Sequence, residues 1–181
     1  MHTMVTGGAL RLPFRFQQQR PGAGRDFPFL RRRFTPRTVF MEVGAADCEL
    51  ALQAAGYVER VYAVDVSGQF LHSVLVPCNL RLVLCDGVRI PVPEARVDVA
   101  WSGRFLDQLH PDDRLEHLRS VRRSLASDGV YFCIASKGTR DVLHSFLQAG
   151  FSAVHCYAGG VRIPSAAARL IPQARLRYAA R

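Results

Sequence analysis

Long hydrophobic runs are missing from this 181-residue sequence. No stretch approaches the roughly 20 uninterrupted apolar residues of a membrane helix, so no membrane span is expected. The N-terminus also lacks the apolar core, about 7–15 residues long, that marks a secretory signal. Together these absences predict a cytoplasmic protein.

Paired cysteines are missing as well. The five cysteines are odd in number and form no C-x-x-C pair, which argues against a disulfide framework and predicts no metal site. We expect free, buried thiols, as in a reducing compartment. The cysteines are Cys48, Cys78, Cys85, Cys133 and Cys156.

Lysine is nearly absent, because Lys137 is the only one and arginine supplies the rest of the basic residues behind the +9 net charge. Residues 1–37 carry eight arginines and one acid, residues 161–181 carry five arginines and no acid, and the middle of the chain is mildly acidic. Basic ends favour an anionic partner, although an arginine-only set is also typical of a GC-rich genome. Aromatic residues do not alternate with the arginines as in a base-stacking platform. We therefore expect only weak, non-specific nucleic-acid binding.

From Thr38 onward, short β-branched runs alternate with helical patterns. Strands are expected at 38–43, 60–64, 80–84, 96–100 and 130–135, helices at 48–55, 69–74, 112–125 and between Thr139 and Gly150, and a hairpin at 152–157 and 161–163. Five alternations of strand and helix predict a doubly wound, Rossmann-like α/β fold. Its sheet is expected to be mostly parallel, with helices on both faces and an antiparallel C-terminal hairpin.

The start of regular strand and helix patterns at Thr38 also predicts the domain organisation. Residues 1–37 are a basic, Phe-rich arm without periodicity, residues 38–163 form the α/β domain, and residues 164–181 form a basic tail. A chain of this length buries enough surface to support one core without a disulfide or metal.

The first expected strand leads into Gly44, Ala45 and Ala46, small residues that let the backbone approach a ligand. Ligands of doubly wound sheets bind beyond the carboxyl ends of the strands. The dinucleotide fingerprint needs glycine at 44, 46 and 49, and the chain meets it only at Gly44, which argues against NAD. Glu42 and Asp47 beside this turn suit a ligand that carries positive charge, such as a sulfonium.

Two further acids end the next strands. Asp65 lies about 20 residues beyond Gly44, where a carboxylate can accept hydrogen bonds from both hydroxyls of a ribose. Asp86 can accept from the exocyclic amine of adenine, and Gly87 leaves room for the ring. Each acid also has a structural alternative, because it could serve its own turn or cap the next helix.

This arrangement resembles the class I S-adenosylmethionine-dependent methyltransferases, in particular the group with the type-11 methyltransferase domain, over about residues 38–157. VFMEVGAADCELAL looks like their first motif, and VYAVDVS looks like the ribose-binding strand end. LVLCDGVRIPVPEARVDVAWS resembles the adenine-binding turn with the next strand. FLDQLHPDDRLEHLRSVRRSLASDGVYFCIAS resembles the fourth-strand loop, the following helix and the fifth strand.

The resemblance implies S-adenosylmethionine as cofactor. Residues 44–46 would line the methionine moiety, Asp65 would hold the ribose, Asp86 the adenine amine, and Ser102 would lie near the sulfur. The implied cofactor-binding residues are Glu42, Gly44, Ala45, Ala46, Asp65, Val66, Asp86, Gly87, Trp101 and Ser102. Ala46 stands where relatives usually have a second glycine, which is tolerable if φ is negative there.

Histidine offers one candidate catalytic base. A base is needed only if the acceptor is a hydroxyl or a protonated amine. His110 is the best-placed candidate, and a cap of the following helix is its structural alternative. His117, within that helix, is expected to be exposed.

Three functions remain open. The leading one is methyl transfer to a small-molecule or biosynthetic acceptor, which could be saccharide-linked. The second is a non-catalytic or partner-dependent cofactor-binding protein, because the short connection 136–138 leaves out the acceptor-binding insertion of relatives. The third is an RNA methyltransferase that uses the arginine-rich ends. The Phe-rich arm, or a second subunit in a homodimer, is expected to cover the site.

Overall fold

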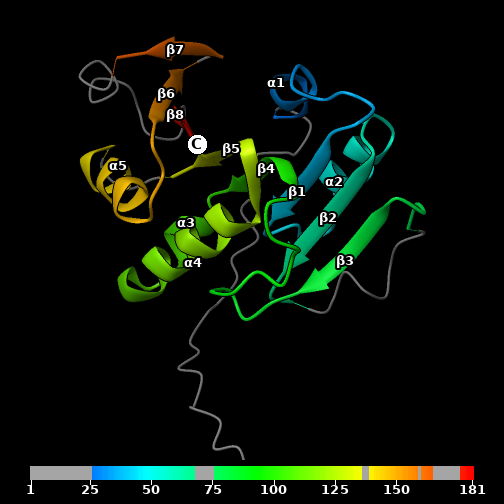
Figure 1. Ribbon diagram of the computed structural model, residues 1–181, viewed down its shortest axis with the longest axis horizontal. Coiled ribbons are helices and arrows are strands. Elements are labelled where there is room, and N and C mark those ends of the chain that lie inside the picture. The colour runs from blue at the N-terminus through cyan, green and yellow to red at the C-terminus, as the bar shows by residue number, and fades with distance from the viewer. Residues whose placement is uncertain (1–25, 68–75, 136–138, 159, 165–175) are drawn as a thin grey trace, which may run out of the picture.

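A computed structural model describes residues 26–67, 76–135, 139–158, 160–164 and 176–181. Figure 1 shows one sheet with helices around it. The strands are β1 (Val39–Val43), β2 (Arg60–Asp65), β3 (Leu80–Leu84), β4 (Val97–Gly103), β5 (Leu125–Ile134), β6 (Val154–Ala158), β7 (Val161–Ile163) and β8 (Leu176–Ala180). The helices are α1 (Phe27–Arg31), α2 (Glu49–Ala55), α3 (Phe105–Gln108), α4 (Pro111–Ser124) and α5 (Thr139–Gln148).

The sheet has the strand order β3-β2-β1-β4-β5-β8-β6-β7. The five strands β1 to β5 are parallel, β8 runs antiparallel to β5 and β6, and β6 pairs with β7 as a hairpin. The chain moves outward from β1 to β3 and then crosses to β4, so the strand order reverses between β1 and β4. The predicted doubly wound, mostly parallel fold with an antiparallel C-terminal hairpin is confirmed.

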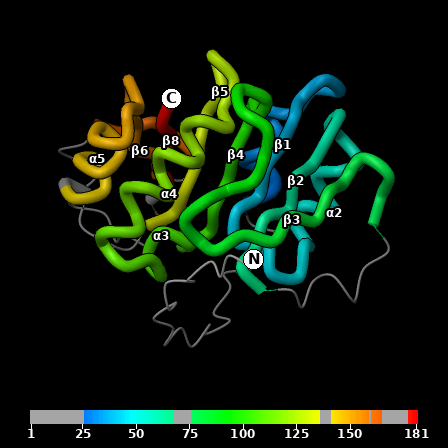
Figure 2. The backbone as a smooth tube through the Cα atoms, turned by 60° about the horizontal axis from the view of Figure 1, so that its bottom comes forward, coloured from blue at the N-terminus to red at the C-terminus, as the bar shows by residue number. Residues whose placement is uncertain are grey.

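Helices cover both faces of the sheet, with α3, α4 and α5 on one face and α1 and α2 on the other (Figures 1 and 2). The period of two in a strand sends neighbouring side chains to opposite faces. On β1, Met41 packs in the cluster beneath α4, whereas Phe40 packs in the cluster beneath α1 and α2. Each face therefore has its own apolar core.

The strands β1 to β3 lie close to their expected positions, but β4 and β5 are longer than their sequence patterns indicated. β4 continues to Gly103, because Trp101 and Ser102 pair with both β1 and β5, and Gly103 pairs with β5. β5 begins at Leu125 instead of Val130, because Leu125 pairs with Val97. The short helix α3 was also not expected. Hydrophobic periodicity predicts that Val142, Leu143, Phe146 and Leu147 of α5 face inward. Val142 and Phe146 are buried, but Leu147 is 57% exposed, so the prediction for Leu147 is wrong.

The C-terminal residues contribute a strand that the sequence did not predict. Leu176–Ala180, assigned above to the basic tail, form β8 between β5 and β6. Tyr178 is fully buried, and Ala179 and Ala180 are buried beside it. The basic tail has no apolar run long enough to predict a strand inside the sheet.

The described part of the N-terminal arm packs on the face that carries α2. Leu30 of α1 is fully buried, and the ring of Phe29 meets that of Phe132 edge-on at 5.2 Å. Asp26 forms an ion pair with Arg177 of β8, in which Arg177 Nε donates to Asp26 Oδ1 at 3.0 Å. The arm is thus joined to the last strand of the sheet.

Some expectations fall outside the described residues. They are the helix at 69–74, the short connection 136–138 and most of the basic ends, residues 1–25 and 165–175. Among the helices that are described, none has the length and apolar character needed to cross a membrane.

Candidate functional site

The turn after β1 is held against the end of β2. The backbone N–H groups of Gly44 and Ala45 both donate to the carbonyl of Val64, at 2.8 and 3.1 Å. Gly44 has a φ of +77°, and a Cβ atom there would lie 2.9 Å from Cδ2 of Phe105. The glycine is therefore required both by backbone conformation and by the close approach of Phe105.

The same turn holds two non-glycine residues in the left-handed region. Ala46 has a φ of +43° and Cys48 a φ of +61°. The expectation of a negative φ at Ala46 is wrong, because the chain must turn sharply between the end of β1 and the start of α2. Arg104, at the end of the neighbouring strand β4, has a φ of +59°. Backbone strain of this kind clusters at functional sites.

Asp65 closes the turn from the end of β2. Its Oδ2 accepts the N–H of Ala46 and its Oδ1 accepts the N–H of Ser67, both at 2.8 Å. The residue is only 3% exposed. The structural alternative considered for Asp65 is therefore present, and each carboxylate oxygen retains a lone pair for a further donor.

Asp86 lies beyond the end of β3 and is exposed. Its Oδ1 accepts from the N–H groups of Val88 and Arg89, at 2.9 and 2.6 Å. Gly87 has a φ of +87°, and a Cβ there would lie 3.2 Å from Cγ1 of Val66. The acid builds its own turn through one oxygen, which leaves Oδ2 on the exposed side chain.

The turns after β1, β2 and β3 are neighbours in space. Val43 pairs with Val64, and Asp65 pairs with Leu84. The N–H of Cys85 also donates to the backbone carbonyl of Asp65 at 2.9 Å. Three of the predicted elements, Gly44, Asp65 and Asp86, therefore meet at one edge of the sheet.

Three other predicted residues lie inside the sheet instead. Glu42, Trp101 and Ser102 are 7%, 2% and 0% exposed. The Ser102 hydroxyl is hydrogen-bonded to the Tyr131 hydroxyl at 2.6 Å, and burial raises the pKa of Tyr131 well above its usual value. Both Trp101 and Ser102 belong to the last residues of β4. Their role toward a cofactor stays a prediction.

The two histidines of this region differ in burial, and only His117 departs from its expected position. His110 precedes α4, and its Nδ1 accepts from the N–H of Asp112 at 3.4 Å, as a helix cap. Its side chain is 66% exposed. His117, expected to be exposed, is fully buried. The signal for its burial was present, because His117 shares the three- and four-residue spacing of the buried residues Ser120, Val121 and Ser124.

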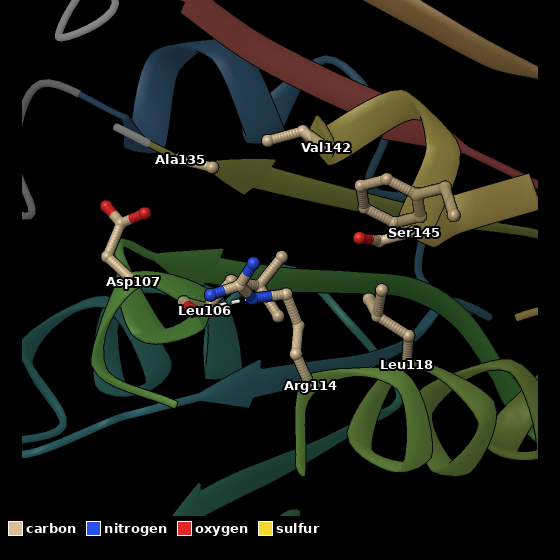
Figure 3. Close-up of a pocket in the computed structure, with 8 residues that line it drawn as sticks. Leu106, Asp107, Arg114, Leu118, Ala135, Val142 and Ser145 are labelled. Carbon is tan, nitrogen blue, oxygen red and sulfur yellow. Dashed lines mark hydrogen bonds between the residues drawn. The ribbon is translucent and has the colours of Figure 1, made fainter. Parts of the chain in front are cut away.

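A small pocket opens at the same edge of the sheet, next to Ala135 at the end of β5. It lies between α3, α4 and α5 and has a volume of about 10 Å³, enough for one water molecule. Figure 3 shows Arg114 reaching from α4 toward Leu106, whose carbonyl accepts from Arg114 Nε at 3.3 Å. Asp107 and Ser145 are the other polar residues of the wall.

Metal-ligand clusters of three or more His, Cys, Asp or Glu side chains are absent from the part of the chain that the structure describes. Cys48, Cys133 and Cys156 are buried as expected, whereas Cys78 is exposed, so the expectation of a buried thiol is wrong there. Burial raises the pKa of Cys85, with Asp86 and Asp65 adding to that rise. Its thiol therefore stays protonated between the two carboxylates.

Comparison with known proteins assigns this site to a family. A family model for the methyltransferase domain matches residues 41–133, just over half of the chain. The chain belongs to the methyltransferase domain family. This match covers part of β1, all of β2 to β4 and most of β5, together with the turns that carry Gly44, Asp65 and Asp86. No curated protein sequence matches the chain.

Solved methyltransferase structures share the fold of this methyltransferase domain. A putative methyltransferase from Bacillus halodurans C-125 is 15% identical, with a TM-score of 0.63 over 74% of this chain and 73% of that one. A putative methyltransferase of Haloferax volcanii, in complex with the Trm112 methyltransferase activator, is 13% identical, with a TM-score of 0.63 over 87% and 91%. Phosphoethanolamine N-methyltransferase 2 of Haemonchus contortus, with S-adenosyl-L-methionine, is 14% identical, with a TM-score of 0.66 over 76% and 39%.

S-adenosylmethionine is the cofactor of this methyltransferase domain. The donor and acceptor groups of the site fit that molecule. Ribose hydroxyls and an adenine amine are donors, and the ends of β2 and β3 present two carboxylates as acceptors. The acids at this edge also suit the positively charged sulfonium. A phosphate-binding turn attracts anions and would not suit it.

Proposed function

We propose that this protein is an S-adenosylmethionine-dependent methyltransferase that acts on a small-molecule or biosynthetic acceptor, with a saccharide-linked molecule included in that class. One observation carries the proposal. The Gly44 turn and the carboxylates of Asp65 and Asp86 stand at the adjoining carboxyl ends of β1, β2 and β3, beside the reversal of strand order. Residues 38–163 with β8 form the catalytic unit of the proposal.

The cofactor is proposed to lie across the three turns. Gly44, Ala45 and Ala46 would contact its methionine part through the backbone. Asp65 would accept from the ribose hydroxyls with the lone pairs that Ala46 and Ser67 leave, and Asp86 would accept from the adenine amine through Oδ2. Val66 and Gly87, which approach each other closely, would contact the ring. Glu42, Trp101 and Ser102 would then support the site from within the sheet.

The proposed methyl transfer needs little acid–base catalysis from the residues of this chain. When bound, S-adenosylmethionine supplies an activated methyl group on a good leaving group. The chain has to orient the acceptor in line and exclude water, which is a matter of positioning. His110 would serve as base only for a hydroxyl or a protonated amine, and its exposed position at the start of α4 makes that role the weaker part of the proposal.

The acceptor is proposed to approach through the pocket between α3, α4 and α5. This pocket adjoins the ends of β4 and β5, at the same edge of the sheet as the three turns. Its volume of about 10 Å³ fits only the reacting end of a molecule. Apolar walls with Arg114, Asp107 and Ser145 suit a compact acceptor with a polar group better than a base splayed out of RNA.

The assignment of Asp65 needs a test that separates ribose binding from turn closure, because Asp65→Ala would abolish both. We would measure the affinity for S-adenosylhomocysteine and for its analogue without the ribose 2′-hydroxyl. The wild type should bind the analogue about tenfold more weakly, the equivalent of one lost charge-assisted hydrogen bond. In Asp65→Asn that difference should shrink toward zero, whereas the control Asp128→Asn, an exposed acid near the start of β5, should keep it. An undiminished difference in Asp65→Asn would refute the ribose assignment.

Activity can be tested without knowing the acceptor. Cell extract is incubated with the protein and with cofactor labelled in its methyl group, and the label is followed into small molecules, RNA and protein. We expect labelled small molecules. Label in RNA alone would favour the RNA methyltransferase alternative.

A partner-dependent protein is the second candidate. The Haloferax volcanii neighbour, which spans most of this chain, was solved with a methyltransferase activator. If the protein binds S-adenosylhomocysteine but labels nothing alone, a homodimer or a partner subunit is required to complete the site. Activity that appears only with such a subunit, or only at concentrations where the protein dimerises, would support this candidate.

A further inference from the structure

One fully buried histidine, His117, stands behind the Asp86 turn. Its Nδ1 lies 2.9 Å from the carbonyl oxygen of Gly87. Burial lowers the pKa of His117 to about 4, so the ring is neutral at pH 7. A carbonyl oxygen can only accept, so Nδ1 must carry the proton. The hydrogen bond thus selects one tautomer of the ring.

The same ring reaches the first turn through a second aromatic residue. The rings of His117 and Phe105 lie 5.0 Å apart between centroids, at an interplanar angle of 37°. Phe105 in turn packs against Gly44, where an added Cβ would be 2.9 Å from Phe105 Cδ2. Gly87 and Gly44, one in each turn, are therefore connected by two side chains in contact, one from α3 and one from α4.

Helix α4 also fastens the next part of the Asp86 turn. One turn of helix beyond His117, Oγ of Ser120 accepts the N–H of Ile90 at 2.9 Å. Asp86 Oδ1 holds the N–H groups of Val88 and Arg89. The backbone from Gly87 to Ile90 is thus attached to the core at both ends, which restricts where the Asp86 carboxylate can point.

We propose that His117 is a positioning residue of the cofactor site. As an Nδ1–H donor it anchors Gly87, and through its contact with Phe105 it keeps the Asp86 turn in a constant position relative to the Gly44 turn. The consequence for binding rests on the proposed function, in which Asp86 accepts from the adenine amine. The anchoring itself does not depend on that function.

Two substitutions separate the hydrogen bond from the ring. His117→Asn keeps an amide N–H near the position of Nδ1, and His117→Phe keeps an aromatic ring against Phe105 but leaves the Gly87 carbonyl without its donor. Ser124→Ala is the matched control, because it removes another buried hydrogen bond of α4, from Ser124 Oγ to the Ser120 carbonyl, and leaves in place the bond from Ile90 N–H to Ser120 Oγ and all bonds to Gly87.

Hydrogen exchange of the cofactor-free protein tests the anchoring. The amides of residues 87–90 should exchange about tenfold faster in His117→Phe, whereas His117→Asn and Ser124→Ala should stay close to the wild type. Equal exchange in His117→Phe and Ser124→Ala would overturn the proposal. If His117→Phe does not fold, ¹⁵N NMR of the wild-type ring decides, since a proton on Nε2 instead of Nδ1 at pH 7 contradicts the anchoring bond.

Affinity measurements test the consequence for the cofactor. S-adenosylhomocysteine is compared with S-inosylhomocysteine, which carries an oxygen in place of the adenine amine. His117→Phe should bind S-adenosylhomocysteine about tenfold more weakly and lose most of the preference between the two. His117→Asn, which keeps the donor to Gly87 but lacks the ring against Phe105, should regain most of the preference and part of the affinity. If the wild type does not prefer S-adenosylhomocysteine over S-inosylhomocysteine, the proposed role of Asp86 is refuted. The hydrogen-exchange experiment then still tests the anchoring by His117. A preference that is intact in His117→Phe refutes the positioning role.

Discussion

At the scale of single residues, the site combines conformational strain with buried polar anchors. Ala46, Cys48 and Arg104 adopt left-handed backbone conformations at the ends of β1 and β4. Asp65 and His117 are buried groups whose hydrogen bonds go to the backbone of the two turns. The hydrogen bonds of Asp65 and His117 hold the two turns in backbone conformations that the local sequence alone would not favour.

Strain at Ala46 predicts that Ala46→Gly raises stability. A left-handed alanine costs about 1–2 kcal/mol, and the entropy that glycine loses on folding, about 0.4–1 kcal/mol, offsets part of that gain. We expect an increase of up to about 1 kcal/mol in the free energy of unfolding, measured in urea. Ala45→Gly is the control, because Ala45 is fully buried and its φ is not positive, so this variant should lose stability. Equal losses in both variants would contradict the assigned strain.

Burial of His117 predicts a pH dependence of stability. The pKa is lowered from 6.5 to about 4 by burial, against the opposing effects of the Gly87 carbonyl and Asp86. In this pH range the unfolded chain binds a proton that the folded chain does not, so stability falls as pH decreases from about 6.5 to about 4. The loss should approach about 3 kcal/mol. The curve for His117→Asn should lack this component, and parallel curves for the two proteins would refute it.

At the scale of elements, the ends of the chain stabilise each other on one face of the sheet. Arg177 of β8 pairs with Asp26, and its guanidinium lies 5.3 Å from the ring centroid of Phe29. The aromatic rings of the arm continue this contact, since Phe34 meets Phe40 at the start of β1 at 5.0 Å. The helix α1 is therefore part of the folded domain.

The pair Asp26–Arg177 should be worth more than an exposed pair. Asp26→Asn leaves a mostly buried guanidinium without its charge partner, and we expect a loss of about 3 kcal/mol. Removal of the exposed pair Arg89–Glu116, whose side chains are 75% and 52% exposed, should cost less than about 1 kcal/mol. Denaturant unfolding compares the two, and similar losses would show that the Asp26 pair is not effectively buried.

At the scale of the whole molecule, the described part of the arm connects segments that are far apart in the sequence. Asp26 pairs with Arg177 of β8, and the ring of the next residue, Phe27, lies 5.6 Å from that of Tyr57, which precedes β2. Cover of the cofactor by the arm stays a prediction.

Deletion of residues 1–25 tests that cover, because it spares Asp26 and the buried Leu30. The truncated protein should keep its melting temperature within a few degrees, bind S-adenosylhomocysteine more weakly and lose activity. Deletion of residues 1–30 is the comparison, since it removes α1 almost entirely and should also lower stability. If the shorter deletion binds the cofactor as tightly as the full chain and stays monomeric, both the arm and a second subunit are excluded as covers.

The basic ends predict weak RNA binding that depends on salt. Affinity should fall steeply as salt rises, with a slope set by the number of phosphates neutralised, and should vanish near physiological salt. Titration of single-stranded RNA at several salt concentrations measures this. A tight complex that resists salt would support an RNA acceptor instead.

Apart from the short helix α3, the order of the described strands and helices from Thr38 to Gly150 could be predicted from the sequence, as could the turns with Gly44, Asp65 and Asp86. Hydrophobic periodicity and turn residues are local properties, so they carry that information in any context. Local patterns could not predict the burial of His117, the position of β8 or the packing of α1 on the sheet. They depend on partners that are distant in sequence: Gly87 for His117, β5 and β6 for β8, and Phe132 for Phe29. Which groups become buried is decided by these tertiary contacts, because a side chain loses its water only when another part of the chain covers it.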